Sequence, residues 1–201
     1  MPKVVDHEAR RKRLVEAVWA LAVRDGLEGV TLRRVAAEAE VSMGQVQHYY
    51  RSMQELVRDA LDRSVLALNA KIEATIAEQG ATSAEGMLRA CLRAMVAPDE
   101  ESVRLLRFSV AVMGRVISDP AMAKVLAPGD EALLDFTAGM IAGAREERGA
   151  SASPVGVDRF DADICWALAT SLGVDLALGH RTREAAEALL DYQIERVLGG
   201  G

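Results

Sequence analysis

The chain of 201 residues is 50% hydrophobic and 27% charged, which supplies a core for one large or two small domains and argues against disorder. No apolar run reaches the roughly 18 residues that a membrane helix needs, and the charged N-terminal residues differ from a signal peptide, so we expect a cytoplasmic protein without a membrane span. The net charge of −6 argues against nucleic-acid binding only if it is spread evenly.

The charge is in fact distributed unevenly. Residues 1–52 carry 9 Lys and Arg against 7 Asp and Glu, a net charge of +2, whereas residues 53–201 carry 15 against 23, a net charge of −8. The densest basic run, RRKR at residues 10–13, lies in the positive part. Such a run is typical of a solvated helix start as well as of a nucleic-acid-binding surface, so both interpretations stay open.

The cysteines and histidines form no recognisable chemical site. Cys91 and Cys165 lie far apart without a CxxC spacing, and His7, His48 and His180 are equally scattered. Both cysteines lie within apolar helical patterns, which predicts small buried residues rather than reactive thiols. We therefore expect no disulfide framework, no metal and no cofactor.

The distribution of residue types predicts an all-helical fold. Ala and Leu are abundant, aromatic residues make up only 4%, and no run alternates apolar and polar residues between turn signals. The first expected helix, residues 8–25, carries an apolar stripe and ends at Gly26. Two short helices follow, one capped by Thr31 and one running from Ser42 to near Tyr50.

A long helix over residues 53–79 is expected to connect the two parts of the chain. Ser52 and Glu55 have the spacing of a capping box at its start, and Thr82 and Glu85 have the same spacing at the start of the next helix. Further helices are expected over residues 99–117, 130–148, 158–178 and 182–198, about nine in all.

The segment 31–50, TLRRVAAEAEVSMGQVQHYY, has the pattern of a helix-turn-helix, two short helices separated by a tight turn. The inward positions are apolar, and they are Leu32, Val35, Ala36, Ala39, Val41, Val46 and Tyr50. Gly44, Gln47 and His48 lie on the opposite face of the second helix, which has no acidic residue. A surface that approaches phosphates needs such an acid-free face.

Three side chains in this segment leave alternatives open. Arg33 and Arg34 lie in the first turn of a helix, where the helix dipole disfavours cations by roughly 0.3–1 kcal/mol unless a phosphate is near. Arg34 can instead pair with Glu38, four residues further on. Gln45 lies three residues after the capping serine and can be bound to its own helix end, whereas Gln47 is freer to contact adenine in the major groove.

These residues resemble the tetracycline-repressor (TetR) family of bacterial regulators over residues 8–61. The matching motifs are Gly26, Thr31 with Val35, Ala36 and Ala39, Val41-Ser42-x-Gly44, His48-Tyr49-Tyr50 and Ser52-x-x-Glu55-Leu56. The resemblance implies an all-helical ligand-binding domain, a dimer, phosphate contacts by Thr31, Ser42 and Tyr49, and a groove-facing set of Gln45, Gln47 and His48. The expected DNA-binding residues are Thr31, Arg33, Arg34, Ser42, Met43, Gly44, Gln45, Gln47, His48 and Tyr49.

The sequence departs from the family pattern at three positions. Glu40 replaces a usual glycine before the turn, so either it adopts a left-handed conformation at a cost of about 1–2 kcal/mol or the turn differs. Met43 replaces a common basic or small residue, and Gln47 replaces a frequent aromatic residue. The change at Met43 removes one expected phosphate contact, and the change at Gln47 affects the expected operator sequence rather than the expected DNA-binding role.

The two ends of the chain resemble the branch of choline/betaine-type regulators. The resemblance rests on the opening residues 1–4, MPKV, and on segments within residues 167–198. We do not carry a betaine ligand over, because no dense aromatic cluster suggests a cage for a quaternary ammonium group.

The last two expected helices carry apolar stripes that predict a homodimer. Pairing them with a twofold copy gives a four-helix bundle and places two recognition helices about 34–36 Å apart, while the alternative is packing within one chain. The expected dimer residues are Leu168, Leu172, Leu176, Leu189, Leu190 and Val197, accompanied by Ile164 and Ala186.

A small-molecule effector is expected to bind between the connecting helix and the helices within residues 83–148. Arg107 and Arg115 are possible polar anchors. The alternative for each apolar lining residue is a place in the core. The expected lining residues are Met87, Phe108, Met113, Phe136 and Met140, with Met95 beside them.

An enzyme is not expected, because no Walker loop, GxGxxG or HExxH motif is present. The sequence predicts a transcriptional regulator, a repressor that a small molecule releases from palindromic operator DNA. Its expected parts are a DNA-binding domain over residues 1–52, a connecting helix over 53–79 and an effector-binding and dimerisation domain over 80–201. A helical protein-interaction scaffold without specific DNA binding is the alternative.

Overall fold

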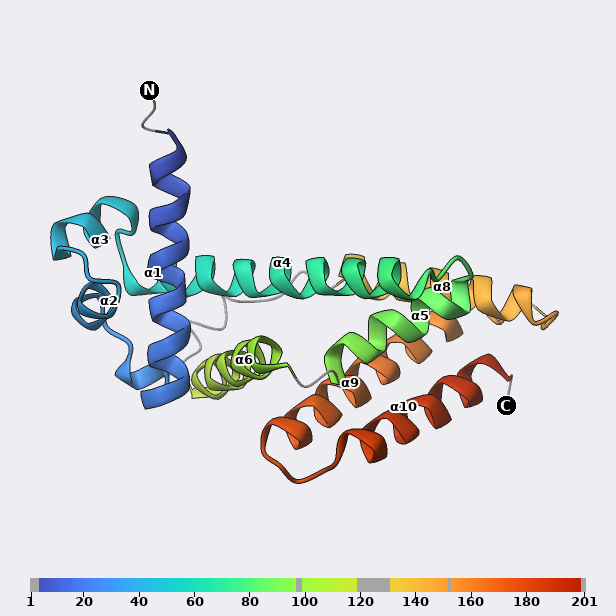
Figure 1. Ribbon diagram of the computed structural model, residues 1–201. Coiled ribbons are helices and arrows are strands. Elements are labelled where there is room, and N and C mark those ends of the chain that lie inside the picture. The colour runs from blue at the N-terminus through green and yellow to red at the C-terminus, as the bar shows by residue number, and fades with distance from the viewer. Residues whose placement is uncertain (1–3, 97–98, 119–130, 152, 200–201) are drawn as a thin grey trace. The chain divides into compact units, whose positions relative to one another are not determined.

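The computed structural model describes residues 4–96, 99–118, 131–151 and 153–199 (Figure 1). Over these residues the chain forms helices and no strand, which confirms the predicted all-helical fold. The first five helical elements are α1 (Val4–Asp25), the 3-10 helix η1 (Leu27–Gly29), α2 (Leu32–Glu38), α3 (Met43–Tyr49) and α4 (Met53–Gln79). The others are α5 (Ala84–Arg93), the 3-10 helix η2 (Ala94–Val96), α6 (Glu100–Ser118), α8 (Glu131–Glu147), α9 (Val157–Ala177) and α10 (Arg183–Leu198).

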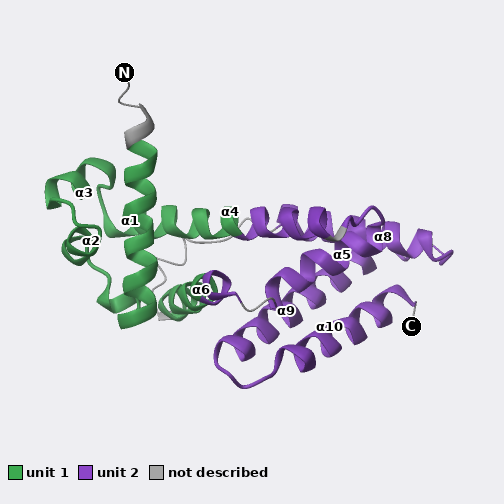
Figure 2. Cartoon of the chain, in the orientation of Figure 1, with its two compact units in different colours: residues 1–67, 104–127 green, residues 68–103, 128–201 purple. Residues whose placement is uncertain are grey.

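The chain divides into two compact units (Figure 2). Unit 1 comprises residues 1–67 and 104–127, and unit 2 comprises residues 68–103 and 128–201. The compact units therefore do not follow the expected boundary after residue 52, because most of α6 packs with the N-terminal helices. The division of DNA-binding and effector-binding roles along the chain stays a prediction.

Apolar side chains of α1, α2, α3, α4 and α6 form the core of unit 1. Trp19 of α1 connects three of these helices. Its Nε1 donates to the carbonyl oxygen of Ala60 in α4 at 3.1 Å, and its ring lies 6.4 Å from the ring of Phe108 in α6. The guanidinium of Arg104, also in α6, lies 5.5 Å from the centroid of the Trp19 ring. These contacts hold α4 and α6 against α1.

The core of unit 2 is formed by α5, η2, α8, α9 and α10, together with Ile72 of α4. A polar pair is buried in it. Trp166 Nε1 donates to Thr137 Oγ1 at 2.9 Å, and the Thr137 hydroxyl donates to the carbonyl oxygen of Leu133 at 2.8 Å. The predicted burial of Cys91 and Cys165 is confirmed, and burial raises the pKa of each thiol to about 11.

The helix caps follow the local sequence with one correction. Ser52 Oγ accepts from the Glu55 amide at 3.1 Å, as the capping-box spacing predicts. The cap of α5, however, is Ser83 and not Thr82, because Ser83 Oγ accepts from the Gly86 amide at 3.0 Å. The described helices include none that is long and apolar enough to cross a membrane.

Candidate nucleic-acid interface

In the turn between α2 and α3, Glu40 adopts the left-handed conformation, which is one of the two alternatives considered for this residue. The φ angle of Glu40 is +52°, and Glu40 is the one described residue other than glycine with a positive φ. The Val41 amide donates to Ala36 O at 2.9 Å and the Glu40 amide to Ala37 O at 3.1 Å. This hydrogen-bond pair is a Schellman motif, in which glycine is preferred at the left-handed position. The Nη2 atom of Arg13 in α1 lies 2.9 Å from Glu40 Oε2 and forms an ion pair with it.

A capping box begins α3 and occupies one of the expected base-reading side chains. Ser42 Oγ accepts from the Gln45 amide at 3.2 Å, and Gln45 Oε1 accepts from the Ser42 amide at 3.3 Å. Gln45 is therefore bound to its own helix end, one of the two alternatives that the spacing left open. Gln47 is exposed and keeps its amide group accessible.

The exposed face of α3 combines polar and apolar groups without an acid. Met43, Gly44, Gln47 and His48 are exposed, with Met43 at 38%. The opposite face buries Val46, and Tyr50 follows it at the helix end, with 0% and 1% exposure. The predicted inward and outward faces of this helix are confirmed. The surface presents one amide, one imidazole and an open backbone at Gly44.

Of the two arginines expected to contact phosphate in α2, Arg34 is held within the chain. Its Nη1 donates to Gly29 O at 2.8 Å, and its Nη2 donates to Asp25. The alternative pair with Glu38 is not formed, since Glu38 accepts instead from Arg24 at 2.9 Å. Arg33 is exposed and has no ion pair with any side chain of the described residues. Thr31, the predicted cap, accepts from the Arg34 amide at 3.3 Å.

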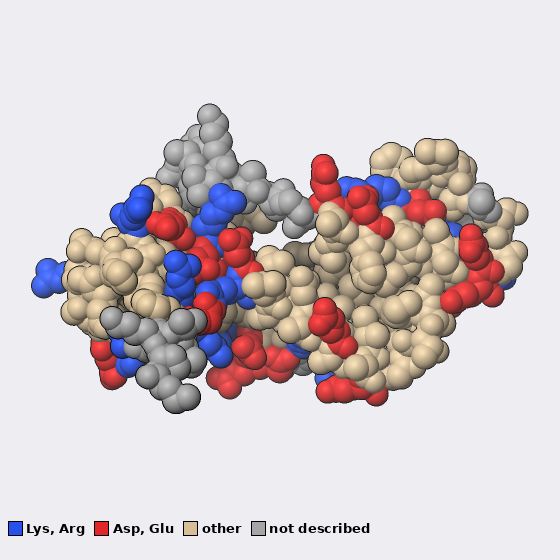
Figure 3. All heavy atoms as spheres, turned by 90° about the horizontal axis from the view of Figure 1, so that it is seen from above, with Lys and Arg blue, Asp and Glu red and all other residues tan. Residues whose placement is uncertain are grey.

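The basic run at residues 10–13 contributes to the internal structure of unit 1. Arg13 binds Glu40, and the guanidinium of Arg11 lies 5.6 Å from the centroid of the Tyr50 ring. Figure 3 shows basic and acidic side chains interleaved on the side of the molecule that carries the N-terminal helices. Neither a solvated helix start nor a nucleic-acid-binding surface, the two interpretations of this run, anticipated these contacts within the unit.

A buried hydroxyl at the end of α3 connects it to α4 and α1. The Tyr50 hydroxyl donates to Asp59, and burial together with this hydrogen bond raises the pKa of Tyr50. Arg63 Nε donates to Asp59 at 3.1 Å, and its Nη1 donates to Glu8 at 2.6 Å. Sequence reasoning missed Asp59 and Arg63, whose i, i+4 spacing was the available signal.

Tyr49 is half-buried and is bound by a residue for which the sequence suggested no role. The Nδ1 atom of His7 in α1 lies 2.8 Å from the Tyr49 hydroxyl. The two rings meet edge to face, with centroids 5.6 Å apart, and the His48 ring meets the Tyr49 ring in the same manner at 5.1 Å. The 42 residues between His7 and Tyr49 explain why no local pattern indicated this contact.

The family comparison matches this same part of the molecule. The model of "Bacterial regulatory proteins, tetR family" matches residues 14–60, from the middle of α1 into α4. Residues 14–60 are thus a tetR-family segment. The resemblance inferred from the motifs around Thr31, Ser42 and Tyr49 is therefore confirmed.

Curated relatives of this chain are transcriptional regulators. The HTH-type transcriptional regulator PksA of Bacillus subtilis is 36% identical over 104 residues, which cover 52% of this chain and 50% of PksA. The HTH-type transcriptional regulator BetI of Paraburkholderia phymatum is 31% identical over 129 residues, which cover 62% of this chain and 63% of BetI. The matches thus span about half to two thirds of these relatives' lengths.

The tetR-family fold extends beyond the segment matched by the family model. The crystal structure of a putative TetR-family transcriptional regulator from Rhodococcus sp. superposes with a TM-score of 0.82 and covers 95% of this chain and 99% of that chain. Its sequence identity of 21% supports similarity of fold alone. The helices of both compact units are thus those of a TetR-type fold.

The residues expected to line an effector pocket are divided between the two units. Phe108 is fully buried in the core of unit 1, and Met113 of α6 is 63% exposed. In unit 2, Met140 is buried, Met87 packs against the same core and Phe136 is 54% exposed. Neither hollow described below contains any of these five, so the effector pocket stays a prediction.

A hollow of about 300 Å³ lies in unit 1 beside the helix-turn-helix. Its polar side chains are Glu28, Gln54 and Arg115, which come from η1, α4 and α6. The other lining residues are Leu27, Val30, Met53 and Val57. Arg115 was expected as a polar anchor of the effector, and this hollow is where the structure places it.

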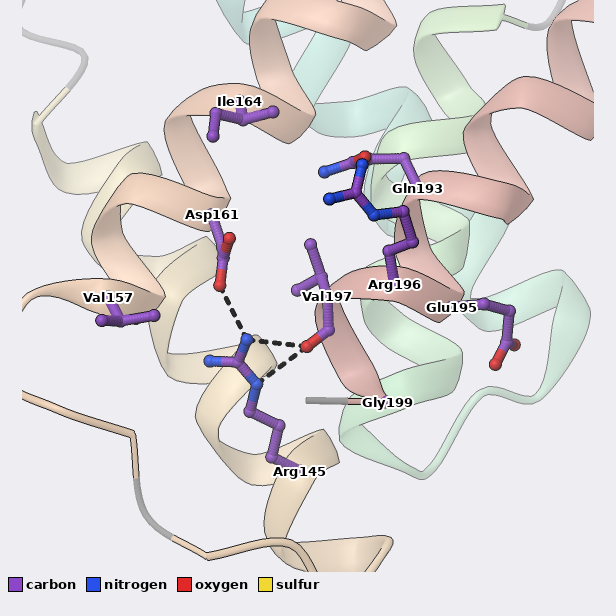
Figure 4. Close-up of a pocket in the computed structure, with 9 residues that line it drawn as sticks. All are labelled: Arg145, Val157, Asp161, Ile164, Gln193, Glu195, Arg196, Val197 and Gly199. Carbon is purple, nitrogen blue, oxygen red and sulfur yellow. Dashed lines mark hydrogen bonds and ion pairs between the residues drawn. The ribbon is translucent and has the colours of Figure 1, made fainter. Parts of the chain in front are cut away.

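A larger groove of about 560 Å³ lies in unit 2 between the start of α9 and the end of α10 (Figure 4). Arg145 of α8 is 8% exposed at its base and donates to Val197 O at 2.7 and 2.9 Å and to Asp161 at 2.7 Å. Ser153 and Asp158 accept from its remaining nitrogen. Since all its donors are satisfied, Arg145 joins three helices and is not free to bind a ligand.

The structure divides the residues of the expected dimer face. Leu172, Leu190 and Val197 are 2%, 0% and 3% exposed, because they pack in the core of unit 2. Leu168 and Leu176 are half-buried, and Leu189 is 40% exposed. Packing within one chain, the alternative considered for these stripes, thus accounts for the three buried residues. The exposed large apolar side chains of α9 and α10 are those of Phe160, Ile164, Leu189 and Tyr192.

Proposed function

We propose that this chain is a sequence-specific DNA-binding transcriptional regulator that inserts α3 into the major groove. The observation that carries the proposal is the acid-free exposed face of α3, held by a Schellman turn and a capping box within the segment that matches the tetR family. Gln47 is its base-reading side chain, because its amide is exposed whereas that of Gln45 is used in the cap. Thr31, Arg33, Ser42 and Tyr49 are the proposed phosphate contacts.

We further propose that the regulator is a cytoplasmic homodimer. The four exposed large apolar side chains of α9 and α10, Phe160, Ile164, Leu189 and Tyr192, would meet their copies in a four-helix bundle. A twofold arrangement of this kind presents two recognition helices to a palindromic operator at a separation of about 34–36 Å. The dimer can thereby contact both half-sites of the operator, whereas a single α3 contacts only one.

We also propose that a small-molecule effector releases the repressor from its operator. The support is the family resemblance together with the course of α4, which runs from beside α3 into unit 2. An effector that binds among the helices of unit 2 would shift α4 and with it the spacing of the two recognition helices. The change in operator affinity is bounded by the difference between the effector's affinities for the two spacings.

The DNA-binding proposal is tested by measuring, through fluorescence anisotropy, how tightly the protein binds the intergenic DNA upstream of its own gene. A scrambled duplex of equal length is the control, and both are measured across a salt series. We expect tighter binding to the upstream DNA and a linear fall of log K with log salt. Gln47→Ala should weaken operator binding by about tenfold and leave binding to the scrambled duplex unchanged. Asn69→Ala, which removes an exposed amide of α4, is the matched control.

Two outcomes would contradict the proposal. Equal binding of both duplexes by the wild-type protein would exclude sequence-specific recognition of this DNA. No binding to either duplex at low salt would favour the alternative of a helical protein-interaction scaffold.

A further inference from the structure

A direct hydrogen bond joins α1 to the recognition helix at the edge where phosphate contact is proposed. His7 Nδ1 and the Tyr49 hydroxyl are 2.8 Å apart, a normal length for such a bond. The Tyr49 ring also meets both imidazole rings, with ring-plane angles of 66° to His7 and 80° to His48, and the two imidazole centroids lie 6.3 Å apart. Both histidines are exposed, so the group lies at the surface of the unit.

The chemistry of phosphate fixes the direction of this bond in a DNA complex. Phosphate oxygens only accept hydrogen bonds, so a tyrosine that contacts one must donate its single hydroxyl proton to it. The lone pairs of the tyrosine oxygen are then the only groups left to face His7. The bond between the two side chains must therefore be donated by an Nδ1–H of His7 and accepted by Tyr49.

We propose that His7 is a positioning residue for DNA binding, which holds the Tyr49 hydroxyl with its proton directed at an operator phosphate. The inference rests on the proposed function, because it requires that Tyr49 meets DNA. His7 orders the tyrosine side chain before DNA arrives, so that less side-chain freedom is lost on binding. The chain Nδ1–H to hydroxyl to phosphate also polarises the hydroxyl, which strengthens its contact with the anion.

A double-mutant cycle tests the pair. His7→Ala should weaken operator binding about fivefold, whereas the same change in a Tyr49→Phe background should have an effect below about twofold, because the hydroxyl that His7 positions is gone. His7→Asn, whose amide can place an N–H near the position of Nδ1, should restore most of the affinity. His180→Ala removes an exposed histidine from unit 2 and is the matched control.

A spectroscopic measurement separates this role from a merely structural one. Histidine-ring ¹⁵N spectra of the operator complex should show His7 with a proton on Nδ1. Circular dichroism and thermal unfolding of each variant establish that it is folded.

Three results would overturn the inference. They are wild-type affinity in folded His7→Ala, an equal loss on His7→Ala with and without the Tyr49 hydroxyl, and a His7 that carries its only ring proton on Nε2 in the complex. A wild-type protein that does not discriminate the operator would instead overturn the proposed function, and the inference with it.

Discussion

Arg13 in α1 and Glu40 in the turn before α3 form an ion pair at 2.9 Å, and Glu40 is the one residue other than glycine, among those that the structure describes, with a positive φ. Both side chains are more than half exposed, at 53% and 81%, so the pair contributes little by itself. The turn is therefore held mainly by its two backbone hydrogen bonds.

Replacing Glu40 with glycine should stabilise the protein. A residue other than glycine in this conformation costs about 1–2 kcal/mol, which the substitution would relieve. Glycine is also more flexible in the unfolded chain, and the cost of ordering it on folding offsets part of this gain in stability. We expect the free energy of unfolding to rise by about 0.5–1 kcal/mol in urea titrations. Glu40→Ala, which keeps the backbone strain and removes the ion pair with Arg13, should be less stable than the wild type. A loss of stability in Glu40→Gly would show that the ion pair outweighs the strain.

The buried hydroxyl of Thr137 should be needed for the stability of unit 2. Thr137→Val keeps the shape of the side chain but leaves the Trp166 indole N–H without its acceptor. We expect a loss of about 1–3 kcal/mol in the free energy of unfolding. Thr170→Val, at an exposed position of α9, is the control, and an equal small effect of both changes would contradict the prediction.

A charge on the exposed face of α9 should dissociate the proposed dimer. Ile164 is 52% exposed in the single chain, so Ile164→Asp should leave each protomer folded. Sedimentation of the variant should show a monomer at concentrations where the wild-type protein is a dimer, because the carboxylate would be buried against its copy. Val155→Asp changes another exposed apolar residue outside both helices and should remain dimeric. A monomeric wild type would contradict the proposed dimer itself.

Acid should weaken the polar network that joins α5, α8 and α10. Arg148, which donates to Glu195 at 2.9 and 3.2 Å, is the main cause that lowers the pKa of Glu195 from 4.5 to about 2, and Arg89 adds to it. Because the folded pKa is depressed, the stabilisation is fully present above the ordinary value and is lost as the pH falls from about 4.5 through about 2.

The measurement is the unfolding temperature as a function of pH. Over that range the wild-type protein should lose more stability than Glu195→Gln, which cannot titrate at this position. Glu146→Gln, on the exposed end of α8, should follow the wild-type curve. Identical slopes for Glu195→Gln and the wild-type protein would show that the network contributes nothing.

The sequence predicted most of what depends on neighbours along the chain. The helices, the caps at Ser42 and Ser52 and the outward face of α3 follow from spacings of three and four residues, which backbone geometry dictates. The pairing of Arg34 with Asp25 was missed, since nine residues and a bend separate them and the nearer Glu38 offered the expected helical spacing.

The contacts that only the fold determines were not predictable. The spacing that places Leu189 and Leu190 on a stripe cannot decide which of them faces the chain's own core, and the structure buries Leu190 completely. The link between His7 and Tyr49 likewise depends on the angle at which α1 passes α3. Such an angle is set by the packing of all the helices in unit 1.

The placement of the two tryptophans supplies the protein with a separate optical reporter for each unit. Trp19 lies in the core of unit 1 beside Phe108, and Trp166 lies in the core of unit 2 with its indole bound to Thr137. The chain contains no other tryptophan. The emission of a Trp19→Phe protein would therefore follow unit 2 alone, and that of a Trp166→Phe protein unit 1 alone, so that the order in which the units respond to heat, DNA or a ligand can be observed without any added label.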